Sequence, residues 1–158
     1  MHESPDPRHS EAADYFVRRF RVPEDAISTL CFREWREEIW AVSAPPPKGI
    51  ASRRPPGLRA LRRTPTGLKP TSAFLVHLGP RITASRVDVD LRSLESLLLG
   101  RRIETDATDG FVALCFRGDV VGCGRARGGI LQAVIPTGRR RELLLALADI
   151  AETESLNL

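Results

Sequence analysis

The stretch that decides the fold is residues 110–136, which read GFVALCFRGDVVGCGRARGGILQAVIP. Two apolar runs flank the Arg-Gly-Asp of residues 117–119, and this spacing predicts a β-hairpin with a tight turn rather than an adhesion motif. The run ILQAVI at 130–135 predicts the next strand, and residues 138–151 predict an amphipathic helix. Short strands joined by glycine-containing turns are typical of a small β-barrel.

The residues before this hairpin predict a strand, a helix and another strand. Residues 87–90 read VDVD, the alternation of a half-buried strand. Asp90 is placed to cap a helix over 91–99, and Gly100 to end that helix in a left-handed conformation. Residues 101–105, RRIET, predict a further short strand.

The first half of the chain has a different pattern. Residues 10–20 predict an amphipathic helix, and residues 29–44 a hairpin around Arg-Glu-Glu. The segment 44–57 contains five prolines and predicts a linker. Two strands, over 58–64 and 68–78, are expected on either side of a Pro-Thr-Gly turn.

These elements predict an α+β protein of two parts. The 158 residues are 42% hydrophobic, enough to form a buried core. We assign residues 1–78, including the proline-rich linker 44–57, to a small N-terminal α+β lobe. Residues 79–158 are assigned to a β pseudo-barrel with flanking helices.

Signals for catalysis, cofactors and membranes are weak. The three cysteines and three histidines lack the spacing of a metal site, and no phosphate-binding glycine loop or serine nucleophile elbow is present. We therefore expect no catalytic residue, no metal and no cofactor. The polar N-terminus and the absence of a long apolar run predict a cytoplasmic protein without a membrane segment. The near absence of Asn and Gln is a compositional hint of a thermophile.

Charge is distributed unevenly along the chain. The net charge is +4, yet residues 39–87 and 120–141 contain no acidic residue. If these stretches meet on one side of the fold, they form a positive surface for a polyanion. If they scatter in space, the charge mixes with the acids and no such surface exists.

Glycines and arginines coincide in the hairpin region. Gly122 and Gly124 weaken a strand, which indicates close packing of a neighbouring strand or close approach of a nucleotide. Arg125 and Arg127 alternate and are expected to point to one face, where a guanidinium can bind phosphate or stack on a base.

Arg62, Arg63 and Lys69 bracket the turn in the first half and are expected to lie near one run of phosphates. Phe74, Phe111 and Phe116 lie in apolar runs and are expected in the core. With no other aromatic evident for base stacking, recognition of the backbone and shape of RNA is favoured.

The segments VDVDLRSLESLLLGRRI and DGFVALCFRGDVVGCGRARGGILQAVIP resemble a PUA domain. The similarity is greatest to the C-terminal region of Nop/Sun-type RNA cytosine-5 methyltransferases, where segments like LRRTPTGLKPT and an N-terminal lobe precede this domain. The resemblance implies a pseudo-barrel that binds structured RNA, tRNA or rRNA, through the segments 100–102 and 122–127. Together with the arginine clusters, the predicted RNA-binding residues are Arg62, Arg63, Lys69, Gly100, Arg101, Arg102, Gly122, Gly124, Arg125, Arg127, Arg139 and Arg140.

This chain departs from those methyltransferases because the catalytic domain, its cofactor loop and its Pro-Cys nucleophile are absent. We therefore expect a non-catalytic targeting module in RNA modification or ribosome biogenesis, acting with a separate modifying enzyme or assembly factor. The alternative is a protein–protein adaptor without direct RNA contact, with Trp35 and Trp40 as anchors.

Overall fold

The computed structural model describes residues 7–44 and 56–158, so most of the proline-rich segment 44–57 lies outside the described residues. The chain divides into two compact units, Met1–Ser85 and Arg86–Leu158. The sequence had suggested a boundary between residues 78 and 79. In the structure, residues 79–85 belong with the first unit, where Thr83 and Ser85 donate hydrogen bonds to the carbonyls of Arg21 and Arg19.

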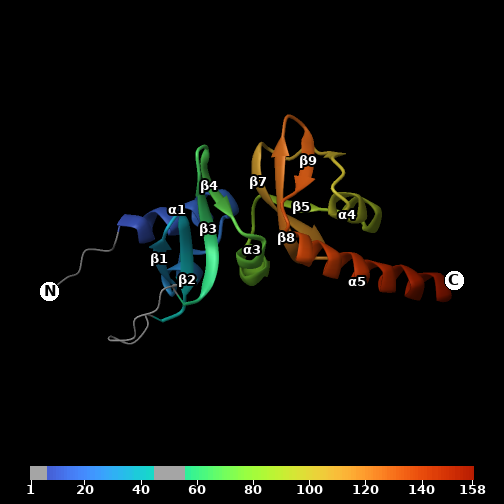
Figure 1. Ribbon diagram of the computed structural model, residues 1–158, viewed down its shortest axis with the longest axis horizontal. Helices are drawn as coiled ribbons and strands as arrows, with labels where there is room; N and C mark the ends of the chain where they lie inside the picture. The colour runs from blue at the N-terminus through green and yellow to red at the C-terminus, as the bar shows by residue number, and fades with distance from the viewer. Residues whose placement is uncertain (1–6, 45–55) are drawn as a thin grey trace. The chain divides into compact units, whose positions relative to one another are not determined.

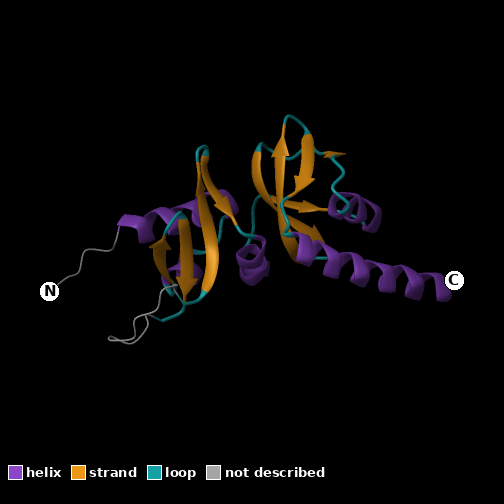
Figure 2. Ribbon diagram, in the orientation of Figure 1, coloured by secondary structure: helices purple, strands orange, loops and turns teal. Residues whose placement is uncertain are grey.

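The first unit is a four-stranded antiparallel sheet with three α-helices (Figures 1 and 2). The strands follow one another in the order β1-β2-β3-β4. The elements are α1 (Pro7–Phe20), α2 (Glu24–Ser28), β1 (Cys31–Trp35), β2 (Glu38–Val42), β3 (Leu58–Thr64), β4 (Gly67–Pro70), α3 (Ser72–Leu78) and the 3₁₀ helix η1 (Gly79–Arg81).

An aromatic cluster joins the helices of this unit to its sheet. The rings of Phe16 on α1 and Phe74 on α3 have centroids 4.8 Å apart, and Phe32 on β1 lies 6.2 Å from Phe74. All three side chains are buried. Burial of such large apolar surfaces is the main source of stability for a unit of this size. The sheet thus has an inner face, which carries Phe32 and packs against α1 and α3.

The strand predicted over 68–78 is wrong beyond Pro70, because residues 72–78 form α3. The Thr71 side chain caps this helix by accepting a hydrogen bond from the Phe74 amide at 3.1 Å. Phe74, Leu75 and Leu78 then fall on one buried face at helical spacing. A short apolar run fits a strand or a helix equally well, and here the cap and the packing decide.

The second unit is a five-stranded sheet with two helices (Figures 1 and 2). The strand order is β5-β7-β8-β9-β6; β5 pairs with β7 in parallel and the other pairs are antiparallel. The sheet curls into a half-barrel, which confirms the predicted α+β class and pseudo-barrel. The elements are β5 (Arg86–Asp88), α4 (Leu91–Leu98), β6 (Ile103–Glu104), β7 (Gly110–Phe116), β8 (Asp119–Arg127), β9 (Ile130–Ala133) and α5 (Thr137–Leu156).

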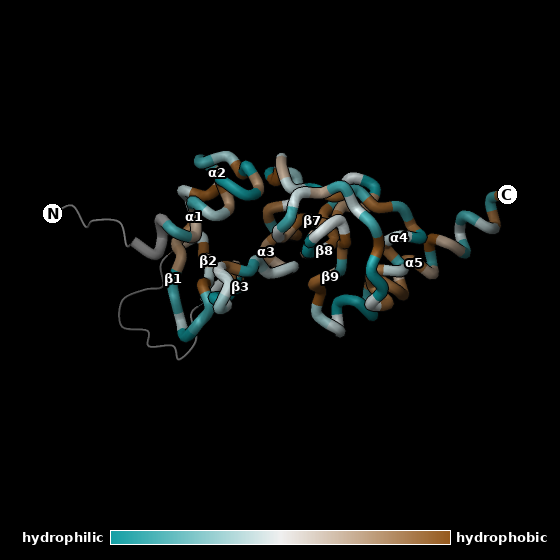
Figure 3. Tube along the Cα trace, turned by 90° about the horizontal axis from the view of Figure 1, so that it is seen from above, coloured by the Kyte–Doolittle hydropathy of each residue, from teal (hydrophilic) through white to brown (hydrophobic). Residues whose placement is uncertain are grey.

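The core of the second unit lies between the curled sheet and its helices. Leu94 and Leu97 of α4 pack with Leu114 of β7 and Leu131 of β9, and all four are fully buried. Figure 3 shows the hydrophobic stretch of β7 inside this unit. On α5, Leu147 is buried and its apolar neighbours pack partly against the core, as the helical pattern predicted.

The residues at the two ends of α4 act as the sequence predicted. Asp90 accepts a hydrogen bond from the Ser93 amide at 2.7 Å and caps α4. At the other end of α4, Gly100 adopts φ 86°, its amide bonds to the Leu97 carbonyl, and the Arg101 amide bonds to Ser96. This is a Schellman motif, and it aims the following chain toward β6.

Within the described residues, no helix combines the length and the apolar character that crossing a membrane requires.

Candidate nucleic-acid interface

Three of the predicted arginines meet at one cleft in the second unit. Arg102, Arg125 and Arg127 line a cavity of about 490 Å³ together with Ile130 and Gln132. Arg102 precedes β6, whereas Arg125 and Arg127 lie on β8. Residues that are more than twenty positions apart in the chain are thus brought together by the pairing of strands.

Strand register explains this arrangement. Side chains two apart on a strand share a face, so Arg125 and Arg127 point the same way. On β9, Gln132 lies opposite Arg125 and Ile130 lies opposite Arg127. The strand β6 pairs with the far side of β9 and carries Arg102 to the same cleft.

The cleft has unmatched positive charge. Arg102, Arg125 and Arg127 form no ion pair with any other described residue, and Arg102 and Arg127 are exposed. Each guanidinium is planar and presents five N–H donors, a geometry that binds phosphate in a bidentate way. The cleft therefore offers three such groups to an anion.

The Phe111 ring lies beside this charge, contrary to the expectation that it is a core residue, whereas Phe116 packs against the core as expected. Both are only partly buried, since they sit at the two ends of β7, whereas Phe74 is buried as expected. The Arg125 guanidinium carbon lies 5.9 Å from the centre of the Phe111 ring, and Arg117 lies 5.1 Å from Phe116. An apolar ring next to an arginine suits a nucleotide, which combines a flat base and a phosphate.

The strand glycines have a packing explanation. Gly122 and Gly124 are both buried. A Cβ added to Gly124 would lie 2.8 Å from Cδ2 of Leu114 and 3.2 Å from Cδ1 of Leu131, which is too close for well-packed atoms. Of the two alternatives drawn from the sequence, close packing therefore accounts for Gly124 without a nucleotide. Contact of Gly122 or Gly124 with RNA stays a prediction.

The remaining predicted RNA-binding residues of the second unit lie at helix ends. Gly100 and Arg101 follow α4 and are exposed, and Arg101 forms no side-chain interaction within the described part of the chain. Arg139 and Arg140 lie in the first turn of α5, where positive charge opposes the helix dipole. Arg139 pairs with Glu142 at 3.4 Å, and the Nε atom of Arg140 is buried without a hydrogen-bond partner.

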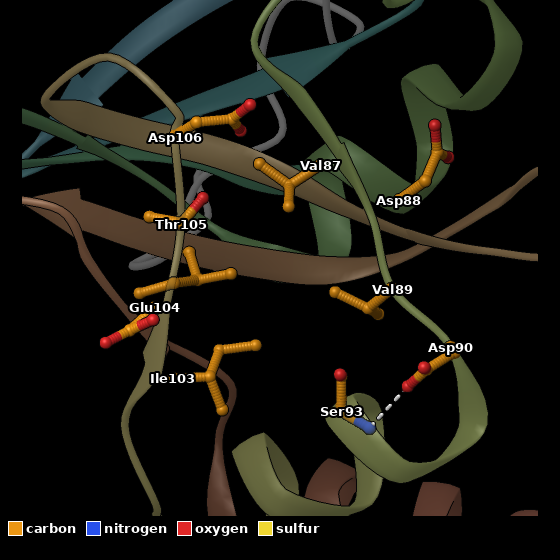
Figure 4. Close-up of a pocket in the computed structure, with 10 residues that line it drawn as sticks. Val87, Asp88, Val89, Asp90, Ser93, Ile103, Glu104, Thr105 and Asp106 are labelled. Atoms are coloured by element: carbon orange, nitrogen blue, oxygen red, sulfur yellow. Dashed lines mark hydrogen bonds between the residues drawn. The ribbon is translucent and has the colours of Figure 1, made fainter.

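A second cleft in this unit has the opposite charge. It has a volume of about 650 Å³ and lies between β5 and β6, the two edge strands. Asp88 and Asp90 line one side, and Glu104 and Asp106 line the other (Figure 4). None of the described residues that line it is basic. Because four carboxylates repel phosphate, the basic cleft is the better candidate for a nucleic-acid interface than this larger cleft.

The region that contains the basic cleft also matches a known protein family. Residues 84–141 match the family model of the methyltransferase RsmF PUA domain. The second unit is a PUA domain. No curated protein matches the chain. The matched region includes Arg102, Arg125 and Arg127, so the basic cleft belongs to the PUA domain itself.

The predicted RNA-binding residues outside the PUA domain lie on β3 and β4 of the first unit. Arg62 and Lys69 are directly opposite each other, so their side chains share a face of the sheet. Arg63 points to the inner face instead. Its Nε atom donates to Glu34 at 2.6 Å and its Nη2 atom donates to Glu11 at 2.7 Å. Two carboxylates already match its charge, so its packing favours a structural role and its RNA contact stays a prediction.

The sequence analysis missed two residues of the basic cleft, Ile130 and Gln132. A signal for both was present. The two glycines at 128 and 129 form a short turn between β8 and β9, and such a turn fixes the register of the strands that it joins. Counting outward from the turn places Ile130 opposite Arg127 and Gln132 opposite Arg125.

Proposed function

We propose that this protein binds structured RNA through the basic cleft of its PUA domain. The observation that supports the proposal is the convergence of Arg102, Arg125 and Arg127, which have no carboxylate partner among residues 7–44 and 56–158, beside the partly exposed Phe111 ring. Arginine forks bind phosphates and the ring provides a surface for a base, while Gln132 supplies an amide that can donate to and accept from a base edge.

We further propose that the chain is a non-catalytic targeting module that delivers a modifying enzyme or an assembly factor to tRNA or rRNA. This chain has a PUA domain related to that of an RNA methyltransferase but lacks the cofactor loop and the Pro-Cys nucleophile of such enzymes. Chemistry on the bound RNA would then come from a separate protein.

The test is RNA affinity measured as a function of salt concentration. The double substitution Arg125→Ala/Arg127→Ala should weaken the binding of a labelled tRNA and flatten the plot of log affinity against log salt. Each lost phosphate contact lowers the magnitude of that slope by about 0.7 to 0.9, so two contacts lower it by about 1.4 to 1.8. Fluorescence anisotropy over a series of salt concentrations gives both quantities.

The matched control is Arg92→Ala, which removes an exposed arginine of α4 from the same unit but outside the cleft. It should leave the slope nearly unchanged. If the double variant binds tRNA with unaltered affinity and slope, the basic cleft is not the interface.

The adaptor alternative keeps one supporting observation. Trp35 and Trp40 are only partly buried, whereas a purely structural role would place both in the core. A purified sample that contains one stoichiometric partner protein and no nucleic acid would favour the adaptor over the RNA-binding module.

A further inference from the structure

The curled sheet of the second unit does not close into a full barrel. Its strand order begins with β5 and ends with β6, so each of these two strands has a neighbouring strand on one side only. The carboxylate-lined cleft of about 650 Å³ lies between them, and the described residues that line it all belong to the second unit. The structure describes residues 86–158 without a gap, so no segment of this unit fills the opening.

The inside of the carboxylate-lined cleft is apolar. Val87 and Val89 on the β5 side and Ile103 on the β6 side are partly buried and pack against the core of the unit. Leu131 of β9 also lines the cleft and is fully buried. Figure 4 shows the two valines and Ile103 directed into the space between the strands. An apolar side chain that entered this space would leave water and contact a preformed apolar surface.

Carboxylates occupy the alternate positions and form the rim of the cleft. Asp88 and Asp90 lie on the β5 side, Glu104 and Asp106 lie on the β6 side, and all four residues are exposed. Such alternation of exposed and partly buried residues is the pattern of a half-buried strand. Within residues 7–44 and 56–158, none of the four carboxylates forms an ion pair. Their unmatched negative charge favours a basic ligand.

The backbone on both sides of the cleft ends in open strand edges. The Val89 amide donates to a carbonyl of β7 at 2.9 Å, and the Thr105 amide donates to a carbonyl in the turn before β9 at 2.9 Å. Successive residues of a strand direct their N–H and C=O groups to opposite sides. The backbone groups of Asp88 and Glu104 therefore point away from these neighbours and toward the opening. Open edges of this kind are templates for pairing with another strand.

We propose that the carboxylate-lined cleft binds an extended basic segment of a partner protein, which adds to an open edge as a further strand. In a segment with alternating residues, apolar side chains contact Val87 and Ile103 inside the cleft, and Lys or Arg side chains meet Asp88 and Glu104 on the rim. Main-chain hydrogen bonds supply affinity in such strand addition, and the alternate side chains supply specificity. This interaction goes beyond the RNA binding proposed for the basic cleft and does not depend on it.

The arrangement favours a protein segment over other cations. A metal ion requires oxygen ligands that converge on one point, whereas Figure 4 shows Asp88 and Glu104 directed away from each other. The described residues also contain no group of acidic, histidine or cysteine side chains that could hold a metal ion. A polyamine would match the charge of the rim but has no side chains for the apolar inside. An extended basic peptide uses the rim, the inside and the open edges together.

Peptide binding to the full chain tests the proposal. The probe is a fluorescein-labelled peptide with the alternating sequence Lys-Arg-Val-Arg-Leu-Arg-Lys, and fluorescence anisotropy measures its affinity. We expect a dissociation constant below about 0.1 mM at low salt. The comparison peptide Lys-Arg-Ser-Arg-Ser-Arg-Lys has the same charge but no apolar side chain. It should bind about 10-fold more weakly, because it buries no apolar surface inside the cleft.

Charge variants locate the binding site on the protein. Asp88→Asn/Glu104→Gln removes one carboxylate from each rim and should weaken binding of the alternating peptide by about 3- to 10-fold. The matched control, Asp149→Asn/Glu152→Gln, makes the same change of charge on exposed residues of α5 and should bind like the unmodified chain. Neither variant should lose affinity for tRNA, so failure of this proposal and failure of the basic cleft are distinguishable.

Three results would overturn the proposal. The first is no change in anisotropy with about 0.1 mM of the unmodified chain. The second is equal binding of the two peptides, or an equal loss of binding in the two double variants, which would mean that only overall charge attracts the probe. The third is self-association of the unmodified chain in sedimentation that Asp88→Asn/Glu104→Gln abolishes, which would make a second copy of this chain the occupant.

Discussion

At the scale of single residues, arginines adjacent in sequence have different roles. Arg62 and Arg63 follow each other on β3, so the alternation of the strand sends them to opposite faces. Arg63 bridges α1 and β1 through Glu11 and Glu34, whereas Arg62 stays exposed on the opposite face of the sheet. An acid-free stretch in the sequence cannot separate these cases, because both carboxylates come from segments far away in the chain.

The Arg63 network makes a prediction about pH. The hydrogen bond from Arg63 lowers the pKa of Glu11 from its ordinary value of 4.5. Since the folded-state pKa lies below that of the unfolded chain, the network stabilises the fold above pH 4.5 and this stabilisation is lost as the pH falls through the folded-state pKa. Arg63→Met should lower the free energy of unfolding by about 1 kcal/mol at neutral pH, a small value because both groups are partly exposed.

Urea denaturation at neutral pH and at pH values below 4.5 measures this effect. The difference between Arg63→Met and the unmodified chain should shrink in acid. Arg62→Met is the control and should show little change at either pH. A difference that is the same at all pH values would mean that Arg63 acts through packing alone.

At the scale of elements, the sequence predicted those whose ends carry a strong local signal. The helix over 91–99 was recognisable because Asp90 caps it and Gly100 ends it, and the β7–β8 hairpin because two apolar runs flank a tight turn. In the basic cleft, Arg125 and Arg127 were predictable from their alternation. The two residues that β9 contributes, Ile130 and Gln132, were not predicted. Their position depends on how β9 pairs with β8, and the sequence of β9 alone does not show this pairing.

The helix α3 shows what local patterns miss. Its seven residues are mostly apolar and follow directly on β4, so they continue a strand pattern as well as they begin a helix. Thr71 resolves the ambiguity. Its Oγ1 atom accepts from the Phe74 amide and donates to the Arg59 carbonyl at 2.5 Å, which ties the start of the helix to β3.

This role of Thr71 can be tested with an isosteric substitution. Thr71→Val removes both hydrogen bonds and should lower the free energy of unfolding by about 1 kcal/mol, the usual cost of losing a helix N-cap. Thr153→Val is a suitable control because it removes only an exposed side-chain bond within α5. Thermal unfolding followed by circular dichroism compares the two, and equal midpoints would show that α3 does not depend on its cap.

At the scale of the whole molecule, the second unit has two clefts of opposite sign. The basic cleft lies just before β6 and on β8 and β9, and the carboxylate-lined cleft lies at the open edges β5 and β6. A polyanion is attracted to the first and repelled by the second, so this charge pattern favours one orientation of RNA on the PUA domain. Net charge alone carries no such information, because +4 is the small difference between 24 basic and 20 acidic residues.

The division into two units predicts which part of the chain binds tRNA. Each has its own sheet and its own buried core, and a domain with these features can fold alone. Residues 86–158, expressed by themselves, should unfold cooperatively in urea and bind tRNA with the salt slope of the full chain. A folded fragment 86–158 that fails to bind tRNA would show that the basic cleft needs residues of the first unit.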